Sequence, residues 1–328
     1  MAQVIQLDDR RGPSRCKATT ASGRRCRNVA LDGGFCRVHQ PPPPAERIGP
    51  LDAETVREAI RFLGRRMTGQ YEIDDFGFDG EITEKMFAPL IRPLYRNYWR
   101  TEWRDVENVP AEGSALMVGN HSGTVPVDAL VMKFGLLEHH PAHRHVKLLA
   151  ADLAFRMPVV GSMARKMGAT LACNEDATRL LESGEWVGVF PEGYKGVGKG
   201  FKNRYRLQRF GRGGFVEIAL RTGAPIVPVA IVGSEEIYPM IGNAKLLARI
   251  GGFPYFPITP LFPWLGPLGL IPLPSKWIIR FGEPIDTKAF SPDAWQDAML
   301  VFELTDKVRD IIQQMLHKNL MERRSVFF

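Results

Sequence analysis

Residues 115–130, ALMVGNHSGTVPVDAL, contain the pattern that most strongly predicts the fold class. An apolar run over 115–119 ends in Gly-Asn-His, a glycine-containing turn follows, and Pro126 opens a second apolar stretch. This order is typical of a strand, a turn and a helix in an α/β layer, with proline suited to the first helical turn. Reactive groups in such layers gather where strands end and helices begin, which is where His121 and Asp128 stand.

The same alternation continues along the chain and predicts an α/β fold with parallel strand pairing. Apolar runs predict strands at 115–119, 146–150, 169–173, 186–190, 225–232 and 277–281, and helices are expected at 126–137, 159–167, 175–183 and 213–222. Pro228 stands inside one predicted strand and indicates an edge strand or a bulge, because proline cannot donate to a central ladder.

Three further helical patterns lie outside this core. The stretch 51–66 predicts an amphipathic helix with Asp52 near its N-cap. Residues 82–104 are helical in pattern despite two prolines, and either cover the core or lie at a membrane interface. Residues 293–323 predict a long amphipathic helix that packs on the core or meets a partner or membrane. The expected organisation is therefore 1–40 a small module, 41–50 a proline-rich linker, 51–112 helical, 113–290 the core and 291–328 the C-terminal helix.

Composition limits the function classes. The 328 residues are 45% hydrophobic and 24% charged, as in globular proteins, and the first twelve residues contain no apolar run of the kind a secretory signal needs. Four cysteines disfavour a disulfide scaffold and favour a cytoplasmic compartment. Residues 1–40 carry eight Lys and Arg against three Asp, a net +5 of the chain's +7, so nucleic-acid binding by the whole chain is disfavoured.

Residues 253–274, FPYFPITPLFPWLGPLGLIPLP, have no charge but contain seven prolines. A regular membrane-spanning helix is excluded, because proline removes backbone donors and breaks helices. Two interpretations stay open: an irregular loop buried on the core, or an apolar flap that touches lipid or lines an acyl channel.

His121 and Asp128 form a candidate acid–base pair. A carboxylate in the first turn of the helix could bind one ring nitrogen, fix the tautomer and leave the other nitrogen as a base. A histidine that follows a strand is by itself more often structural than catalytic.

A second polar segment follows the predicted strand 186–190. Phe190, Pro191, Glu192 and Gly193 end that strand, and residues 195–212 then hold seven Lys and Arg with no acid. Such a loop is either solvated or attracts phosphate.

Taken in order, the strand ending in Asn-His with its later Asp, the strand ending in Phe-Pro-Glu-Gly, and the segment Ala-Pro-Ile-Val-Pro-Val resemble the glycerolipid acyltransferase superfamily. Within it, His-Ser-Gly followed by Pro-x-Asp is similar to the monoacylglycerol-acyltransferase-like branch. The resemblance covers roughly 105–285 and implies a mixed sheet flanked by helices.

The resemblance also implies an activity. His121, oriented by Asp128, would deprotonate a hydroxyl of a lysophospholipid or monoacylglycerol, and that oxygen would attack an acyl thioester, either acyl-CoA or acyl carrier protein. Backbone N–H groups near the turn would hold the oxyanion, and no catalytic cofactor is needed. A place on the inner face of the cell membrane is expected. The residues expected to bind substrate are Asn174, Phe190, Pro191, Glu192, Gly193, Lys195, Lys199 and Arg204.

Two positions depart from the family's pattern. The family spacing is His-x4-Asp, and here six residues separate His121 from Asp128. Asn174 stands where the family has an arginine for the acceptor phosphate, and it is either a ligand or a helix N-cap. A lipid- or acyl-CoA-binding protein and a thioesterase using the same histidine are the alternative functions.

The first 40 residues hold Cys16, Cys26, Cys36 and His39, the last two in a Cys-x2-His knuckle. Four such ligands suit tetrahedral zinc, and we predict a structural zinc module; the alternative is a tail with incidental cysteines. Its arginines would suit contact with nucleic acid, anionic lipid or a protein.

Overall fold

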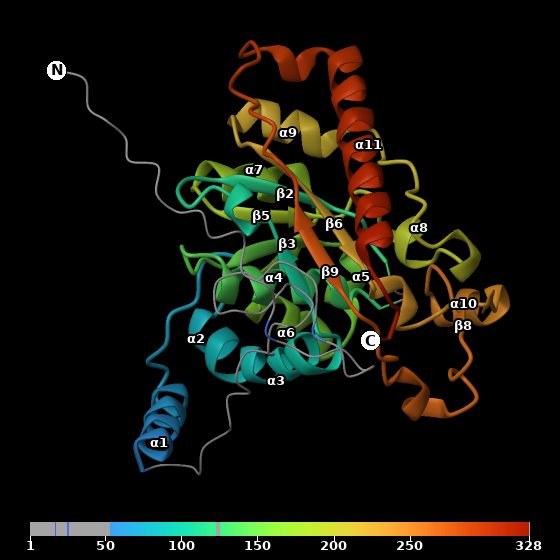
Figure 1. Ribbon diagram of the computed structural model, residues 1–328. Coiled ribbons are helices and arrows are strands. Elements are labelled where there is room, and N and C mark those ends of the chain that lie inside the picture. Colours follow the sequence, from blue (N-terminus) through green and yellow to red (C-terminus); the bar gives the residue numbers. More distant parts are fainter. Residues whose placement is uncertain (1–16, 18–24, 26–52, 123–124, 328) are drawn as a thin grey trace. The chain divides into compact units, whose positions relative to one another are not determined.

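The computed structural model describes residues 17, 25, 53–122 and 125–327 (Figure 1). The predicted zinc ligands Cys16, Cys26, Cys36 and His39 lie outside the described residues. The chain divides into two compact units, Met1–Gln70 and Tyr71–Phe328. In the first unit, the helix expected at 51–66 is α1, Ala53–Met67.

The second unit is built around a seven-stranded mixed sheet of order β1-β9-β6-β2-β5-β3-β4. Strands β6, β2, β5, β3 and β4 are mutually parallel, as predicted, and β9 runs antiparallel to β6. The strands are β1 Glu102–Arg104, β2 Ala115–Gly119, β3 Val146–Ala150, β4 Ala169–Leu171, β5 Trp186–Val189, β6 Ile226–Val232 and β9 Ile278–Phe281.

The central strands are apolar throughout because both of their faces are buried. Alternate residues of β2 separate cleanly: Ala115 and Met117 belong to one core cluster, and Leu116 and Val118 to the other. The two-residue period of a strand thus supplies side chains to two cores, one on each face of the sheet.

Helices cover both faces (Figure 1). One core contains buried side chains of α4 and of the helical run ending at Tyr98, and the other contains those of α7, α9 and α11. The long C-terminal helix therefore packs on the core, with Val301, Val308 and Leu316 buried. The helices are α4 Val127–His139, α5 Asp152–Arg156, α6 Val160–Lys166, α7 Asn174–Glu182, α8 Tyr194–Val197, α9 Gly214–Thr222, α10 Lys245–Gly251 and α11 Ala298–Glu322.

The single helix predicted at 82–104 is wrong in detail. The segment contains α2 Gly80–Ile82, a π-helical turn at Thr83–Phe87, α3 Ala88–Pro93 and a second π-helical turn at Leu94–Tyr98. Pro93 has no N–H to continue a regular α-helical ladder, which is one source of the irregularity. The last three residues, Glu102–Arg104, form the edge strand β1.

Pro228 is not on an edge strand, since β6 lies between β2 and β9. Its carbonyl accepts the N–H of Gly282, one residue beyond the end of β9. The register changes by one residue there, because Val229 pairs with Phe281 whereas Ile226 pairs with Ile285. The proline is tolerated beside this bulge, and the bulge alternative is the correct one.

Residues 233–277 connect β6 to β9 and contain β7 Gly242–Asn243, α10 and β8 Pro257–Ile258. Among the helices of the described residues, none has the length and apolar character to cross a membrane.

Candidate active site

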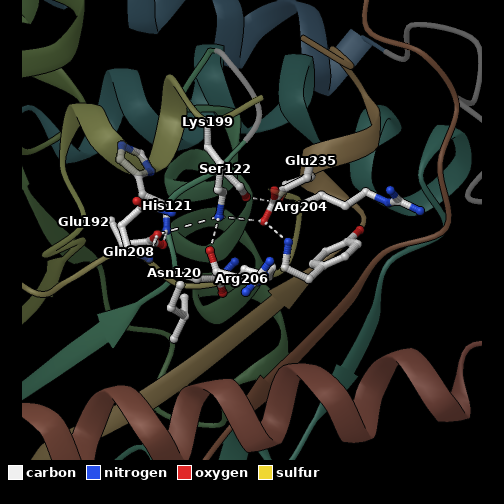
Figure 2. Close-up of polar contacts among 12 residues, drawn as sticks. Asn120, His121, Ser122, Glu192, Lys199, Arg204, Arg206, Gln208 and Glu235 are labelled. Carbon is white, nitrogen blue, oxygen red and sulfur yellow. Dashed lines mark hydrogen bonds and ion pairs between the residues drawn. The ribbon is translucent and has the colours of Figure 1, made fainter. Parts of the chain in front are cut away.

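Three neighbouring strands, β2, β5 and β6, end at the same edge of the sheet, and polar residues follow each of them (Figure 2). His121 follows β2, Glu192 follows β5 and Glu235 follows β6. Parallel pairing of β2 with both neighbours brings these side chains together across 114 residues of sequence.

The His121–Asp128 pair is formed despite its longer spacing. Asp128 Oδ2 lies 3.0 Å from His121 Nδ1 and also accepts the N–H of Ser122 at 2.9 Å. Its Oδ1 accepts the N–H of Ala129 at 2.9 Å, in the first turn of α4. Asp128 is fully buried, whereas the His121 side chain keeps 15% of its surface exposed. With Nδ1 bound to the carboxylate, Nε2 is the nitrogen that can accept a proton from a substrate.

Phe190 supports the imidazole from one side. Its ring stacks on that of His121, with centroids 4.7 Å apart and an interplanar angle of 29°. Gly196, in α8, allows close approach from another direction, because a Cβ there would lie 2.6 Å from the His121 carbonyl oxygen. The histidine is thus held by a carboxylate, a ring and a backbone.

The buried Glu192 carboxylate accepts hydrogen bonds from two separate segments of backbone. Its Oε1 accepts the N–H of His121 at 3.0 Å and its Oε2 accepts the N–H of Gln208 at 2.7 Å. The carboxylate therefore links the end of β2 to the basic loop that follows β5. The adjoining Gly193 has φ of 52°, a backbone conformation that favours glycine.

Lys199 joins Glu192 to a second buried carboxylate. Its Nζ lies 3.6 Å from Glu192 Oε2 and 3.2 Å from Glu235 Oε1, and only 3% of its side chain is exposed. Glu235 also accepts the N–H of Tyr205 at 2.8 Å. Burial raises the pKa of Glu235 to about 7, partly offset by the charge of Lys199.

The end of β2 is also tied directly to β6. Asn120 makes two hydrogen bonds to the backbone of Ile231, donating to its carbonyl at 3.0 Å and accepting its N–H at 2.7 Å. Ser122 Oγ hydrogen-bonds Ser234 Oγ. Both contacts join buried residues, namely Asn120 with Ile231 and Ser122 with Ser234. They therefore fix the backbone on both sides of His121.

The structure places the remaining predicted substrate-binding residues at different positions. Pro191 is half-buried beside the site, and Lys195 is exposed on α8. Arg204 is exposed, its guanidinium lies 4.5 Å from the Phe201 ring centroid, and it lines an open cavity of about 470 Å³ together with Arg323 and Arg324.

Asn174 does not join this cluster. It is the first residue of α7, and Cys173 occupies the N-cap position without a side-chain hydrogen bond, so the N-cap alternative for Asn174 is not the correct one. Asn174 lines a separate cavity of about 150 Å³ between core residues such as Leu116 and Phe215, and none of the His121 cluster lines it.

The expected oxyanion donors are partly excluded. The N–H of His121 donates to Glu192 and that of Ser122 donates to Asp128, so neither is available to a developing oxyanion. Both of these backbone amides already donate a hydrogen bond to a carboxylate. In the part of the chain that the structure describes, no group of three or more His, Cys, Asp or Glu side chains is arranged to hold a metal ion.

Sequence reasoning missed Glu235, Ser234, Tyr205 and Gln208. The signal for the first two was present: Ser-Glu-Glu follows an apolar strand, as His121 and the Phe-Pro-Glu-Gly segment do. Tyr205 and Gln208 use backbone N–H groups, which carry no sequence signal.

Comparison with known proteins gives the kind of domain that this chain contains. Residues 100–232 match the family model named Acyltransferase. The uncharacterized protein Rv0502 of Mycobacterium tuberculosis is 56% identical over 276 residues, which are 84% of this chain and 77% of that protein. The Gallus gallus DGAT1/2-independent enzyme synthesizing storage lipids is 26% identical over 213 residues, 65% of this chain and 58% of that protein.

A solved structure has the same fold. The crystal structure of the 1-acyl-sn-glycerophosphate (LPA) acyltransferase PlsC from Thermotoga maritima aligns with a TM-score of 0.50 and 20% identity, over 80% of this chain and 90% of that one. Residues 100–232 therefore form an acyltransferase-family domain, and the chain belongs to the same family as the mycobacterial protein Rv0502.

Proposed function

We propose that this protein transfers a fatty acyl group from an acyl thioester, acyl-CoA or acyl carrier protein, to a hydroxyl of a glycerolipid acceptor. The observation that carries the proposal is the contact between Asp128 and His121 Nδ1, which leaves Nε2 for a substrate on a side chain that is 15% exposed. A partly exposed histidine with a fully buried carboxylate partner is the arrangement that general-base catalysis requires.

The reaction follows from that geometry. His121 Nε2 takes the proton of the acceptor hydroxyl, and the oxygen attacks the thioester carbonyl carbon. The tetrahedral intermediate collapses with loss of the C–S bond, and the imidazolium returns its proton to the thiolate to give the free thiol. Asp128 stabilises the imidazolium and fixes its tautomer. Glu192 acts through the backbone of His121, since its carboxylate holds that amide.

A lysophospholipid or monoacylglycerol acceptor is the finer part of the proposal. It is supported by relatives named for storage-lipid and lysophosphatidate chemistry. Arg204 and Arg324 line one open cavity, which suits the phosphates of a donor or acceptor, whereas the guanidinium of Arg323 in the same lining is paired with Glu236. The protein would work peripherally on the inner face of the cell membrane, where such acceptors reside.

The test is thiol release from long-chain acyl-CoA by the full chain, with and without a panel of lysophospholipids and monoacylglycerols. We expect acceptor-dependent release that falls at least about a thousandfold in His121→Ala, since the base is lost. His317→Ala is the matched control, because His317 is exposed on α11. Release without any acceptor would identify a thioesterase, and acyl-CoA binding without release would identify a binding protein.

The zinc module at Cys16, Cys26, Cys36 and His39 is a separate proposal. Metal analysis of the purified full chain should find one zinc per chain, lost in Cys36→Ser. If the purified chain contains no zinc and Cys36→Ser has the same properties as the unaltered chain, the zinc module is ruled out.

A further inference from the structure

The connection between β6 and β9 exposes an unusual number of large apolar side chains. We name residues 241–271 the apolar connection. Ile250 is 75% exposed and Trp264 is 71% exposed, although a buried loop was one of the two expectations for 253–274. The exposed apolar residues of this segment are Ile241, Leu246, Leu247, Ile250, Phe253, Trp264, Leu265, Leu268, Leu270 and Ile271.

The charged side chains of this region are all basic. From residue 237 to 282, the sequence contains no Asp or Glu. Lys245 and Arg249 are exposed on α10, on the same short helix as Leu246 and Ile250. A segment that combines exposed apolar side chains with basic residues and contains no acid complements a bilayer that carries anionic headgroups.

The apolar connection lies next to the histidine site. The N–H of Phe201, in the basic loop, donates to the carbonyl of Met240 at 2.8 Å. The Tyr255 ring packs so closely on Gly198 that a Cβ there would lie 3.0 Å from the ring. Burial, and next the negative charge of Asp128, raise the pKa of Tyr255 to about 12. Figure 1 draws α10 and β8 beside α8, which carries Gly196 against His121.

We propose that the apolar connection is the surface by which this protein docks on an anionic lipid bilayer, with Trp264 and its neighbours entering the acyl-chain boundary and Lys245 and Arg249 contacting headgroups. A protein partner would require a fitted surface, whereas exposed indole and aliphatic side chains on a segment that also carries two exposed cations suit the bilayer interface directly. The docking itself is independent of catalysis, but the consequence that it brings a lipid acceptor to His121 rests on the proposed function.

The test is cosedimentation of the full chain, without substrate, with vesicles of phosphatidylcholine alone or mixed with phosphatidylglycerol. We expect binding that is stronger on the anionic vesicles. The double variant Trp264→Ser/Leu268→Ser should bind them at least about tenfold more weakly, since two apolar side chains no longer leave water. Lys245→Gln/Arg249→Gln should lose the preference for phosphatidylglycerol and keep the weaker binding to phosphatidylcholine.

A matched control separates this surface from general stickiness. Leu90→Ser/Met299→Ser removes two apolar side chains of similar exposure from α3 and α11, and should bind vesicles as the unaltered chain does. Bilayers with brominated acyl chains should quench the fluorescence of the unaltered chain, and Trp264→Phe should lose most of that quenching.

Three outcomes would overturn the proposal. They are equal vesicle binding by the Trp264→Ser/Leu268→Ser variant, no vesicle binding by the unaltered chain, and a dimer in solution that this variant dissociates, which would make the surface a protein interface. Thiol release is measured separately with a short-chain soluble donor and acceptor. Vesicle binding without any thiol release would overturn the proposed enzyme function and leave the docking surface standing.

Discussion

Two clusters of buried charge lie at opposite ends of the parallel strands. The cluster at the carboxyl ends is acidic and contains Asp128, Glu192 and Glu235. The cluster near the amino ends of β3 and β4 is basic and contains Lys133 and Lys147. Both place charge out of water, which is costly without partners, and they obtain those partners in different ways.

The acidic cluster uses backbone amides. Its three carboxylates accept hydrogen bonds from five backbone N–H groups, belonging to His121, Ser122, Ala129, Tyr205 and Gln208. Four of those amides lie in loops, so each carboxylate holds a segment of chain beside the histidine. Buried acid here is a means of fixing the geometry of a site.

The basic cluster is satisfied more sparsely. Lys133 Nζ donates to the carbonyl of Val146 at 2.6 Å and lies 5.2 Å from the Phe78 ring centroid. Lys147 Nζ lies 3.7 Å from the same centroid and pairs with Asp74 at 2.5 Å. Burial, and next the charge of Lys147, lower the pKa of Lys133 to about 7. This cluster closes the 74–78 loop onto the sheet and lies away from the histidine, so we expect it to affect stability and not chemistry.

The largest effect should come from Asp128→Asn. The amide keeps the shape, but it can donate to His121 Nδ1 and so place the ring proton on Nε2, which removes the base. We expect kcat to fall by roughly a hundredfold to ten-thousandfold, with KM for the thioester nearly unchanged. Steady-state thiol release measures both constants. Full activity in this variant, with unaltered circular dichroism, would show that the contact with Asp128 does not orient the base.

A smaller effect, on stability, is expected for Lys199→Met. The substitution leaves Glu192 and Glu235 buried without their shared cation, and breaking a buried pair in this way costs about 3–5 kcal/mol. Urea unfolding measures it. Lys195→Met is the matched control, because that lysine is exposed, and it should change the free energy of unfolding by less than about 0.5 kcal/mol.

The pH dependence of stability provides a second test of Lys199→Met. The pKa of Glu235 is raised from 4.5 to about 7, so the folded protein keeps a proton that the unfolded chain releases. Stability therefore falls as the pH rises from about 4.5 through 7. Without Lys199 the fall should extend above pH 7, and adding Glu235→Gln to Lys199→Met should remove the extension. An unchanged pH profile would mean that water already solvates Glu235.

Much of this site could be predicted from the positions at which the apolar strands end. The apolar runs before His121 and Glu192 predicted parallel strands whose carboxyl ends meet, and the structure confirms that these residues share one edge. The longer spacing to Asp128 did not prevent the contact, because α4 begins at Val127 and turns the carboxylate of its first turn back to the ring.

Other features depended on tertiary pairing that no local pattern encodes. Lys199 was expected to meet substrate, and the structure shows its ammonium between Glu192 and Glu235, the latter 36 residues further along. Pro228 indicated an edge, but a bulge beside the end of β9 lets it stand in a central strand. Asn174 follows β4, which is the edge strand of the sheet with β3 and β5 between it and β2. The order of strands in the sheet decides how far such residues lie from His121, and local sequence patterns predict that order poorly.

The smallest effect should come from Lys133→Met, and its sign distinguishes the two clusters. Because the pKa of Lys133 is lowered from 10.5 to about 7, the unfolded chain binds a proton that the folded chain does not, and stability rises with pH from about 7 to 10.5. Methionine fills a similar volume without a charge to desolvate. We expect the variant to be as stable as the unaltered chain or more stable by up to about 2 kcal/mol at pH 7, with a flatter profile up to pH 10. Lys147→Met should instead destabilise, since it leaves Asp74 without its cation. Urea unfolding at pH 7 and 9.5 measures both, and a strong loss of stability in Lys133→Met would show that this lysine is as necessary to the fold as Lys199.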